Sequence, residues 1–330
     1  MRMILSLLAL QLLLVFTELP VHSQITGANW LSKIPDDAAL QTLHIPGTHN
    51  SAAHYEPLPG TAKCQNLSIA EQLLAGVRFF DIRCRHQNDR FDLYHGLVEQ
   101  EQTFTELQQT IAKFLESNPG EVLLISIQET FQAKNNSCSF PKTFLHYQKQ
   151  SPKLWSPVTT VPKLAQARGK AILLRRFRSP NPLGIPATNW KHGDVHRTKQ
   201  LLIQDYFKVK QPTSKWTHIE QLWKKQPQHP GLLALNFTSG YRPGGFGVPN
   251  ITAVSDHINP LLQTKLCSDT PPPPGVLIVD HITAELATAI YQLNLDPKTP
   301  RKVPHETPLR TKLHDLDAMK QKKTEDHSKL

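Results

Sequence analysis

Residues 121–129 read EVLLISIQE, and residues 275–282 read GVLIVDHI. Each segment is a short, nearly continuous apolar run that ends in polar or charged side chains. A strand with one wet face alternates apolar and polar residues, whereas unbroken apolar runs are typical of parallel strands buried on both faces. The two segments therefore predict a parallel sheet that is covered by helices.

Six further β-rich runs are spread along the chain, at residues 40–45, 77–82, 91–94, 171–174, 201–203 and 232–235. Helical patterns lie between several of these runs. Ser68-x-x-Glu71 and Thr103-x-x-Glu106 each match a capping box, in which a hydroxyl and a carboxylate satisfy free N–H groups at a helix start. Strands alternating with helices over this length predict an α/β fold: a single-domain (β/α)8 barrel of the TIM type, complete or distorted. The sequence contains neither a GxGxxG nor a Walker A pattern, so it does not favour an open nucleotide-binding sheet.

The two ends of the 330-residue chain differ from its middle. Met1-Arg2-Met3 precedes the apolar run ILSLLALQLLLVF, and a small residue follows near Ser23. This pattern predicts a secretory signal peptide over residues 1–23, since the run is too short to span a membrane comfortably. Residues 296–330 are rich in Lys, Pro, His and acids, which predicts a flexible charged tail. Residues 24–295 would then form the barrel domain of a secreted, extracellular protein.

Export also affects how the cysteines and asparagines are interpreted. The chain contains four cysteines: Cys64, Cys84, Cys138 and Cys267. An even number in an exported chain predicts two disulfides, with three connectivities open, and the spacings do not resemble a zinc site. Glycosylation sequons, which predict a glycoprotein, begin at Asn66, Asn135, Asn236 and Asn250. We expect the sequon at Asn236 to be unused, because a glycan there would obstruct the mouth of the barrel.

The composition limits the classes of partner. Hydrophobic residues make up 39% of the chain and charged residues 19%, which excludes a disordered or fibrous protein. Lys and Arg total 37 against 27 Asp and Glu, a net charge of +10. A basic protein favours anionic surfaces such as phospholipid headgroups or sulfated glycans. No nucleic-acid-binding module is recognisable, and no obligate protein partner is evident.

Polar side chains follow almost every predicted strand. In a barrel these strand ends share one face, where active sites lie. The residues there include His49, Asp81, Arg83, His95, Gln128, Arg175, Arg176, Asp205 and Asp280. Two histidines, arginines and several carboxylates around one mouth suit general acid–base chemistry on a phosphodiester. One imidazole takes a proton from the nucleophile, the other protonates the leaving oxygen, and an arginine neutralises the phosphoryl oxygens.

The order of these motifs resembles the X domain of phosphatidylinositol-specific phospholipase C. The resemblance covers residues 30–295 in outline and is strongest in the first hundred residues. The segments that carry it are LHIPGTHNSAA (43–53), LLAGVRFFDIRCR (73–85), FDLYHGL (91–97), EVLLISIQE (121–129), GKAILLRR (169–176), LLIQDYF (201–207) and GVLIVDHI (275–282).

The resemblance implies a role for each of five residues. His49 matches the general base that activates the inositol 2-hydroxyl, and His95 matches the general acid that protonates the diacylglycerol oxygen. Arg83 matches the arginine on the phosphate, with Asp81 as the carboxylate beside it. Asp280 matches the carboxylate that orients the general base. The products would be diacylglycerol and inositol 1,2-cyclic phosphate.

Two positions depart from the pattern of the bacterial enzymes. Asn50 stands where those enzymes carry an aspartate, and Gln128 stands where some carry a lysine near the substrate. Calcium-dependent members have an acid at the position of Arg83, and a cation there repels Ca²⁺. The sequence therefore predicts a metal-independent enzyme without a cofactor.

Contacts to the inositol ring are also implied by the resemblance. Arg175 or Arg176 would hold a ring hydroxyl or a second phosphate, and Asp205 would accept hydrogen bonds from ring hydroxyls. Phe207 or Tyr206 would stack on the apolar face of the ring. Asn50 and Gln128 complete the predicted substrate-binding set.

The lead hypothesis is a secreted phosphoric diester hydrolase or lyase that cleaves phosphatidylinositol, or a glycosylated relative, at a membrane surface. The alternative is a catalytically weak or inactive barrel that binds anionic lipids or glycans. Asn50 and the basic charge of the chain favour this alternative. A third hypothesis, a metal-dependent phosphodiesterase for glycerophosphodiesters, needs acidic metal ligands where the chain has Arg83.

Overall fold

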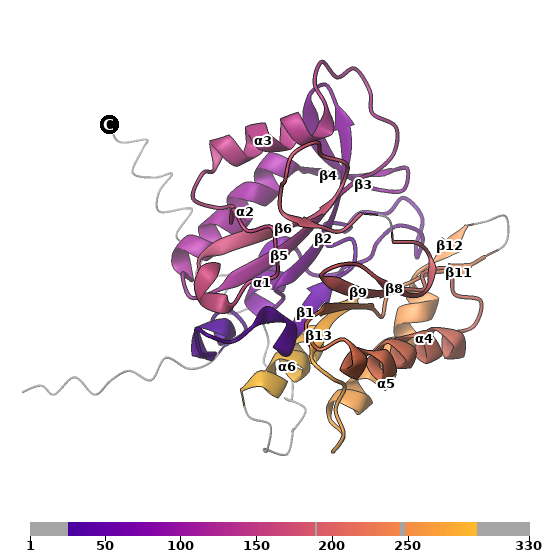
Figure 1. Cartoon of the computed structure of the whole chain (residues 1–330). Coiled ribbons are helices and arrows are strands. Elements are labelled where there is room, and N and C mark those ends of the chain that lie inside the picture. The colour runs from indigo at the N-terminus through magenta and orange to yellow at the C-terminus, as the bar shows by residue number, and fades with distance from the viewer. Residues whose placement is uncertain (1–25, 189, 245–247, 296–330) are drawn as a thin grey trace, which may run out of the picture.

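The structure is a computed structural model that describes residues 26–188, 190–244 and 248–295. The predicted signal peptide (1–23) and charged tail (296–330) lie outside the described residues. Within the described ranges a single large sheet organises the chain, and helices cover its outer face (Figure 1).

The sheet is a curled, mainly parallel array of strands. Its spatial order is β7 (Ile185–Pro186), β6 (Lys170–Arg176), β5 (Val122–Glu129), β2 (Phe79–Gln87), β1 (His44–Thr48), β13 (Gly275–Val279), β10 (Leu233–Phe237), β9 (Leu201–Asp205) and β8 (Gly193–Arg197). Along this order, neighbours from β7 to β9 are parallel, and β8 runs antiparallel to β9. Among the described residues no pairing joins β7 to β8, so the barrel is incomplete. This confirms the predicted α/β barrel class.

In the described part of the chain, six α-helices accompany the strands: α1 (Ile69–Ala75), α2 (Phe104–Ser117), α3 (Phe140–Gln150), α4 (Pro212–Lys225), α5 (Thr252–Leu266) and α6 (Ala284–Tyr291). Both predicted capping boxes are confirmed, with Ser68 and Glu71 at α1 and Thr103 and Glu106 at α2. Between β6 and β9 the described chain forms the short strands β7 and β8 but no α-helix. The barrel is open where this helix is missing.

The predicted strand at residues 91–94 is not a barrel strand. It belongs to β3 (Arg90–His95), which pairs antiparallel with β2 and leads into β4 (Val98–Thr103). The reason is the turn at Asn88 and Asp89, whose positive φ angles of 51° and 56° suit a tight two-residue hairpin. The hairpin returns the chain to the mouth and so brings His95 there. The run at residues 40–45 is also shorter than expected, because Leu40–Thr42 forms a 3-10 helix.

Both faces of the sheet are apolar, as the sequence predicts. On β5, Leu123 and Ile125 pack in the cluster that lies against the helices, whereas Val122 and Leu124 pack in the cluster inside the curl. This division follows from the two-residue period of a strand, which sends successive side chains to opposite faces. The helices and the interior therefore hold the strand ends in a fixed frame around the mouth.

The expectation of two disulfides is wrong. All four cysteines are free, with Cys64 and Cys84 buried and Cys138 and Cys267 partly buried. They belong to separate places: Cys64 lies beside His95, Cys84 is in β2, Cys138 precedes α3, and Cys267 follows α5. Packing and helix caps, not cross-links, therefore hold the described part of the chain.

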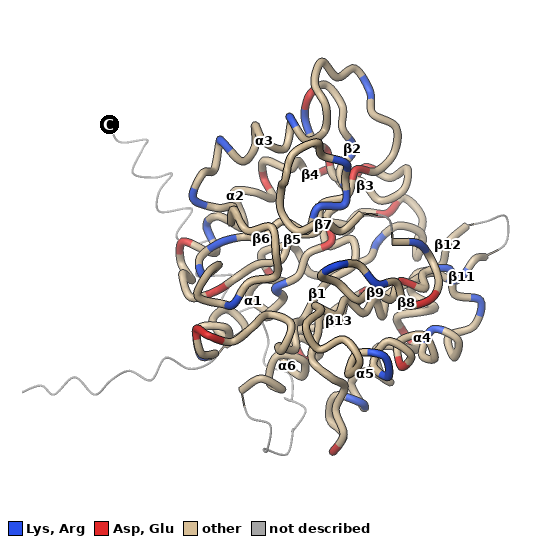
Figure 2. The backbone as a smooth tube through the Cα atoms, in the orientation of Figure 1, with Lys and Arg blue, Asp and Glu red and all other residues tan. Residues whose placement is uncertain are grey.

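Two surface properties bear on the predicted environment. Asn236 is buried, and its side-chain amide donates to the Ile219 carbonyl oxygen at 3.2 Å, so this sequon is inaccessible in the folded protein. Lys and Arg are spread over most elements instead of gathering on one helix (Figure 2). None of the described helices has the length and hydropathy needed to cross a bilayer.

Candidate active site

A cavity of about 350 Å³ opens at the carboxyl ends of the parallel strands. Seven of the predicted site residues line it: His49, Arg83, His95, Gln128, Arg176, Asp205 and Phe207. Gly240, Tyr241, Pro249 and Ile251 complete the lining. Asp81 and Asp280 lie behind the lining residues and contact them from the buried side.

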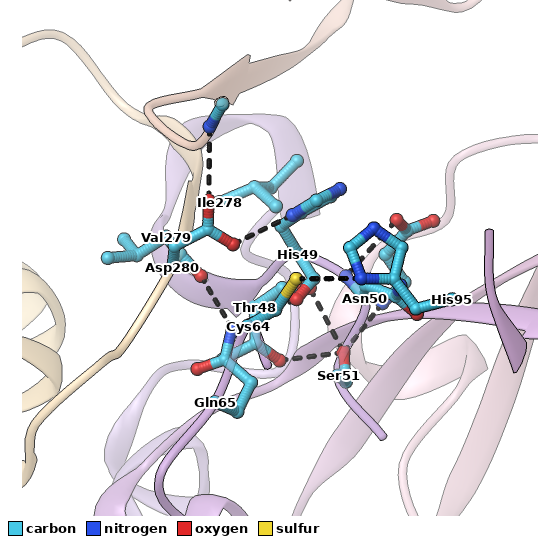
Figure 3. A network of polar contacts seen from close by, with 12 residues as sticks. Thr48, His49, Asn50, Ser51, Cys64, Gln65, His95, Ile278, Val279 and Asp280 are labelled. Atoms are coloured by element: carbon cyan, nitrogen blue, oxygen red, sulfur yellow. Dashed lines mark hydrogen bonds and ion pairs between the residues drawn. The ribbon is translucent and has the colours of Figure 1, made fainter. Parts of the chain in front are cut away.

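His49 follows β1 and is fixed from behind by Asp280. Its Nδ1 lies 2.7 Å from Asp280 Oδ1, and the other carboxylate oxygen accepts from the Gly240 N–H at 3.0 Å (Figure 3). Burial by itself raises the pKa of Asp280, but His49 and the Gly240 N–H hold it below its usual value. Because an ionised carboxylate only accepts hydrogen bonds, Nδ1 carries the proton and Nε2 is left as the basic atom.

Gln65 locks the backbone on both sides of this pair. Its Nε2 donates to the His49 carbonyl oxygen at 2.9 Å and to the Val279 carbonyl oxygen at 2.8 Å. Since Val279 directly precedes Asp280, one side chain joins the end of β1 to the end of β13. The His49–Asp280 geometry is thus set by the sheet.

Arg83 links His49 to a second buried carboxylate. Its Nη2 donates to His49 Nε2 at 2.6 Å and to Asp81 Oδ2 at 3.3 Å. Arg176 Nη1 donates to the other oxygen, Asp81 Oδ1, at 3.0 Å. Burial alone would raise the pKa of Asp81, but the two guanidinium groups lower it to about 2. Asp81 therefore stays ionised and holds two arginines side by side.

His95, at the end of β3, lies beside His49 in the cavity lining. The two ring centroids are 6.1 Å apart and the ring planes are perpendicular. His95 Nδ1 donates to the Ala62 carbonyl oxygen at 2.6 Å, and Cys64 Sγ lies 3.6 Å from the same nitrogen. Burial, together with the charges of Arg83 and His49, lowers the pKa of His95 to about 4. In the free protein at neutral pH, His95 is therefore an uncharged imidazole.

Two of the lining residues, Asp205 and Arg176, are contacted by a residue that the sequence analysis missed, Trp190. Trp190 Nε1 donates to Asp205 Oδ2 at 3.0 Å, and the Arg176 guanidinium lies 3.7 Å from the centroid of the Trp190 ring. Trp190 lies between β7 and β8, in the stretch that lacks a helix. It follows none of the predicted strands, so no signal in the sequence pointed to it.

The prediction for Arg175 is wrong. Its Nε donates to the Leu183 carbonyl oxygen at 2.9 Å and its Nη1 donates to the Phe177 carbonyl oxygen at 2.6 Å, outside the cavity. Arg176, the alternative at the next position, faces the cavity because neighbouring strand residues point to opposite faces.

Asn50 is also outside the cavity lining. It is buried, and its backbone N–H donates to Asp81 Oδ2 at 3.3 Å. Its backbone has a left-handed φ of 39°. Asn50 therefore contacts the arginine-holding carboxylate and not the cavity itself.

The donor set disfavours a cation at this site. One ligand atom each from His49, Cys64 and Asp280 lies within 4.8 Å of the others. However, Asp280 occupies His49 Nδ1, and the Arg83 guanidinium contacts Nε2. The permanent positive charge of the Arg83 guanidinium, which lies beside Nε2, repels a metal ion there. The same cations and the two imidazoles suit an anionic group such as a phosphodiester.

Residues 40–177 match the family model described as "Phosphatidylinositol-specific phospholipase C, X domain". This segment of the chain is therefore similar to that domain. His49, Asp81, Arg83 and His95 all lie inside the matched segment, whereas Asp280 follows the last strand of the barrel.

Two curated proteins that are similar to this chain are both named 1-phosphatidylinositol phosphodiesterase. The protein from Listeria monocytogenes is 27% identical over 230 residues, covering 67% of this chain and 70% of its own length. The protein from Staphylococcus aureus strain Newman is 25% identical over 274 residues, covering 77% and 88%.

Solved structures support the fold of the whole described chain. A variant of the phosphatidylinositol-specific phospholipase C from Staphylococcus aureus superposes with a TM-score of 0.71 at 24% identity, covering 80% of this chain and 98% of that one. The enzyme from Listeria monocytogenes gives a TM-score of 0.67 at 22% identity, covering 81% and 98%. The described chain therefore shares its overall fold with these two proteins.

Proposed function

We propose that this protein cleaves phosphatidylinositol, or a glycosylated inositol phospholipid, into diacylglycerol and inositol 1,2-cyclic phosphate. The observation that carries the proposal is the convergence of two imidazoles, His49 and His95, and the Arg83 guanidinium on one cavity. General acid–base catalysis of a phosphodiester needs one group to take a proton and another to give one. The names of the curated relatives support the same substrate.

The first step uses His49 as the general base. Its Nε2 takes the proton of the inositol 2-hydroxyl while the oxygen attacks the phosphorus, and Asp280 stabilises the imidazolium that forms. In the free protein this nitrogen accepts a hydrogen bond from Arg83. A bound phosphodiester competes for the guanidinium, because a charge-assisted bond to an anion is stronger than one to a neutral ring. Substrate binding therefore frees the base.

The second half of the step uses His95 as the general acid. As the bond between phosphorus and the diacylglycerol oxygen breaks, protonated His95 gives its proton to that oxygen. Arg83, held by Asp81, neutralises the phosphoryl oxygens as charge builds up in the transition state. Hydrolysis of the cyclic product at the same site would reverse the two roles, with water as the nucleophile.

One side of the cavity, lined by Gln128, Arg176, Asp205 and Phe207, fits the inositol ring. Asp205 would accept hydrogen bonds from ring hydroxyls, Phe207 would cover an apolar face, and Gln128 would contact a hydroxyl at the rim. Arg176 replaces Arg175 in this part of the proposal, because its guanidinium lines the cavity. Its position between Asp81 and the Trp190 ring leaves it able to meet a hydroxyl or a second phosphate.

We propose that the reaction needs no metal ion. The buried carboxylate nearest the phosphate site, Asp81, is already neutralised by Arg83 and Arg176 at 3.3 Å and 3.0 Å. A calcium ion bound there would have to displace both guanidinium groups, which themselves supply the positive charge that the reaction requires.

We further propose a secreted protein that works on a membrane surface. Export rests on the signal-peptide pattern of residues 1–23. Apolar side chains in loops at the mouth are exposed: Tyr55 43%, Leu58 62%, Leu97 76%, Phe131 47% and Val248 44%. Together with the net charge of +10, such a rim suits contact with an anionic bilayer at the face where the substrate enters.

The test is turnover of phosphatidylinositol vesicles by the purified protein in excess chelator, followed by phosphorus NMR. We expect a cyclic inositol phosphate signal, and His49→Ala should lower its rate by roughly 10²- to 10⁴-fold. His146→Ala is the matched control, since His146 is exposed on α3 away from the cavity. Cyclic product that requires added Ca²⁺ would refute metal independence.

The alternative, an inactive binder, gives a different result in the same experiment. The protein would then sediment with the vesicles, yet no inositol phosphate would appear. The substitution His49→Ala would leave this binding unchanged. Ionic binding of this kind should weaken as salt is added.

A further inference from the structure

A second group of chemically reactive side chains lies at the far end of the β2–β3 hairpin from His95. It consists of His86 on β2, Asp89 in the hairpin turn and Cys138 in the segment before α3, and we call it the hairpin cluster. One ligand atom from each residue lies within 4.8 Å of the other two. The proposed reaction uses none of these residues.

The three side chains already share hydrogen bonds. Cys138 Sγ lies 3.3 Å from Asp89 Oδ1 and 3.1 Å from the hydroxyl oxygen of Thr143. The same hydroxyl lies 2.9 Å from His86 Nε2. A thiol, a carboxylate and an imidazole are therefore connected around one small space.

The ligands are held in place by the surrounding structure. The His86 ring meets Phe91 and Phe140 edge to face, with centroid distances of 5.4 Å and 5.6 Å. Asp89 Oδ1 accepts from the Ser137 and Cys138 backbone N–H groups at 2.8 Å and 3.0 Å. Because these contacts fix the side chains before an ion arrives, little ordering entropy is lost on binding.

The cluster also has access to solvent. A cavity of about 700 Å³ is lined by His86, Asn136, Cys138 and Pro141 among others. It gives a hydrated ion a path to the ring and the thiol, and it leaves room for a water molecule as a fourth ligand. The cluster around His49 offers no comparable position, because Arg83 contacts its remaining ring nitrogen.

We propose that the hairpin cluster is a zinc site. Zn²⁺ is bound in proteins by imidazole nitrogen, thiolate sulfur and carboxylate oxygen, and three protein ligands plus water complete its tetrahedron. Binding breaks the Cys138 S–H bond, releases that proton to solvent and forms a Zn–S bond. The two ligand charges then balance the ion. Ca²⁺ and Mg²⁺ do not fit, since they require oxygen ligands.

The ion would act as a clamp and not as a catalyst. It would tie the tip of the β2–β3 hairpin to the start of α3, regions that are about 50 residues apart in the sequence. β3 ends at His95, so the clamp would stiffen the strand that presents this imidazole. A ligand that binds only the folded state raises its stability.

The test uses the full-length protein and Co²⁺ alone as a spectroscopic probe, with no lipid present. We expect a thiolate-to-cobalt charge-transfer band at one equivalent, removed when Zn²⁺ displaces Co²⁺. Cys138→Ser should abolish the band, and His86→Gln should weaken Co²⁺ binding by at least about tenfold. Cys267→Ser is the matched control, because that thiol lies at the end of α5 and should leave the band intact.

Two outcomes overturn the proposal. One is a wild-type protein that shows no thiolate band with Co²⁺. The other is a band that survives Cys138→Ser but disappears with Cys64→Ser, which would place the ion at the His49 cluster. As a second readout, Zn²⁺ should raise the Tm of the wild type and of Cys267→Ser but not that of Cys138→Ser. Neither measurement involves turnover. The zinc proposal can therefore be refuted without refuting the proposed phospholipase activity, and the reverse also holds.

Discussion

His95 is uncharged in the free protein, yet the proposed reaction requires it to carry a proton. Burial and the neighbouring Arg83 lower its pKa to about 4, so the free protein holds it uncharged at neutral pH. A general acid must carry a proton, and an anionic phosphate beside the ring supplies the attraction that restores it. Because an unfolded histidine takes up its proton near pH 6.5, His95 also lowers folding stability as the pH falls from about 6.5 to about 4.

We predict that ligand binding raises the pKa of His95. In the free protein, its ring-proton NMR signal should titrate near pH 4. Saturation with an inositol phosphate should move the midpoint upward, because the bound anion favours the charged ring. The control is sodium chloride at the same ionic strength, which should leave the midpoint in place. A free-protein midpoint at or above the ordinary histidine value would contradict the proposed electrostatics.

Asp280 acts through His49, and its replacement should separate orientation from binding. Asp280→Asn keeps the size of the side chain but removes the charge that fixes the Nδ1 proton and stabilises the imidazolium. We expect kcat on phosphatidylinositol to fall by roughly 10²- to 10⁴-fold with little change in KM. Asp256→Asn, an exposed position on α5, is the control. An equal loss in both variants would show that general destabilisation, and not the His49 contact, is responsible.

At the scale of elements, the hairpin and the helix caps decide where the site residues lie. The β2–β3 hairpin brings His95 back over the mouth, and α1 follows directly after the segment that holds Cys64 and Gln65. Ser68 begins α1 with a capping box in which its hydroxyl accepts from the Glu71 N–H. Both features are local in sequence, yet they fix contacts between distant strands.

Removal of the α1 cap should cost stability without touching the cavity. For Ser68→Ala we expect the free energy of unfolding to fall by about 1 kcal/mol, because one helix N–H loses its acceptor. Urea denaturation measures the change. Ser117→Ala, at the last residue of α2 and exposed, is the matched control and should be nearly neutral. A drop of equal size in the control would mean that the cap contributes nothing specific.

At the scale of the molecule, a buried ion pair stabilises the amino-terminal end of the strands, opposite the mouth. Arg78 Nε lies 2.8 Å from Glu121 Oε2, and both side chains are at most 1% exposed. Arg78 also donates to the Gly27 carbonyl oxygen at 2.7 Å, while Glu121 accepts from the Ser32 N–H at 2.9 Å. The pair therefore connects β2 and β5 to the segment that precedes the first strand.

Breaking this pair should destabilise the whole fold. Arg78→Met leaves Glu121 as an uncompensated buried charge, and we expect a loss of about 3–5 kcal/mol in the free energy of unfolding. Arg90→Met is the control, because the Arg90–Asp92 pair at 3.3 Å has an arginine side chain that is 60% exposed. Because the Arg90 guanidinium reaches solvent, this contact should contribute no more than about 1 kcal/mol, although Asp92 itself is buried. Similar losses in the two variants would contradict the assigned role of burial.

Much of the fold follows from local pattern. The doubly buried strands at residues 122–127 and 276–279, the two capping boxes and the polar residues at the strand ends are all readable, because they depend on residues close in sequence. The antiparallel course of residues 91–94 was missed, since the two-residue turn at Asn88 and Asp89 looks like any polar connection. The missing helix between β6 and β9, which leaves the barrel open, was equally hidden.

By itself the sequence determined the barrel class and the order in which His49, Asp81, Arg83, His95 and Asp280 appear along the chain. Only the tertiary structure decided that Arg176 and not Arg175 faces the cavity, that Trp190 contacts Asp205 and Arg176, that the four cysteines stay unpaired, and that His86, Asp89 and Cys138 meet. The physical reason is range. Helix caps and strand periodicity act over a few neighbouring residues, whereas contacts across a cavity depend on how elements far apart in the chain pack together.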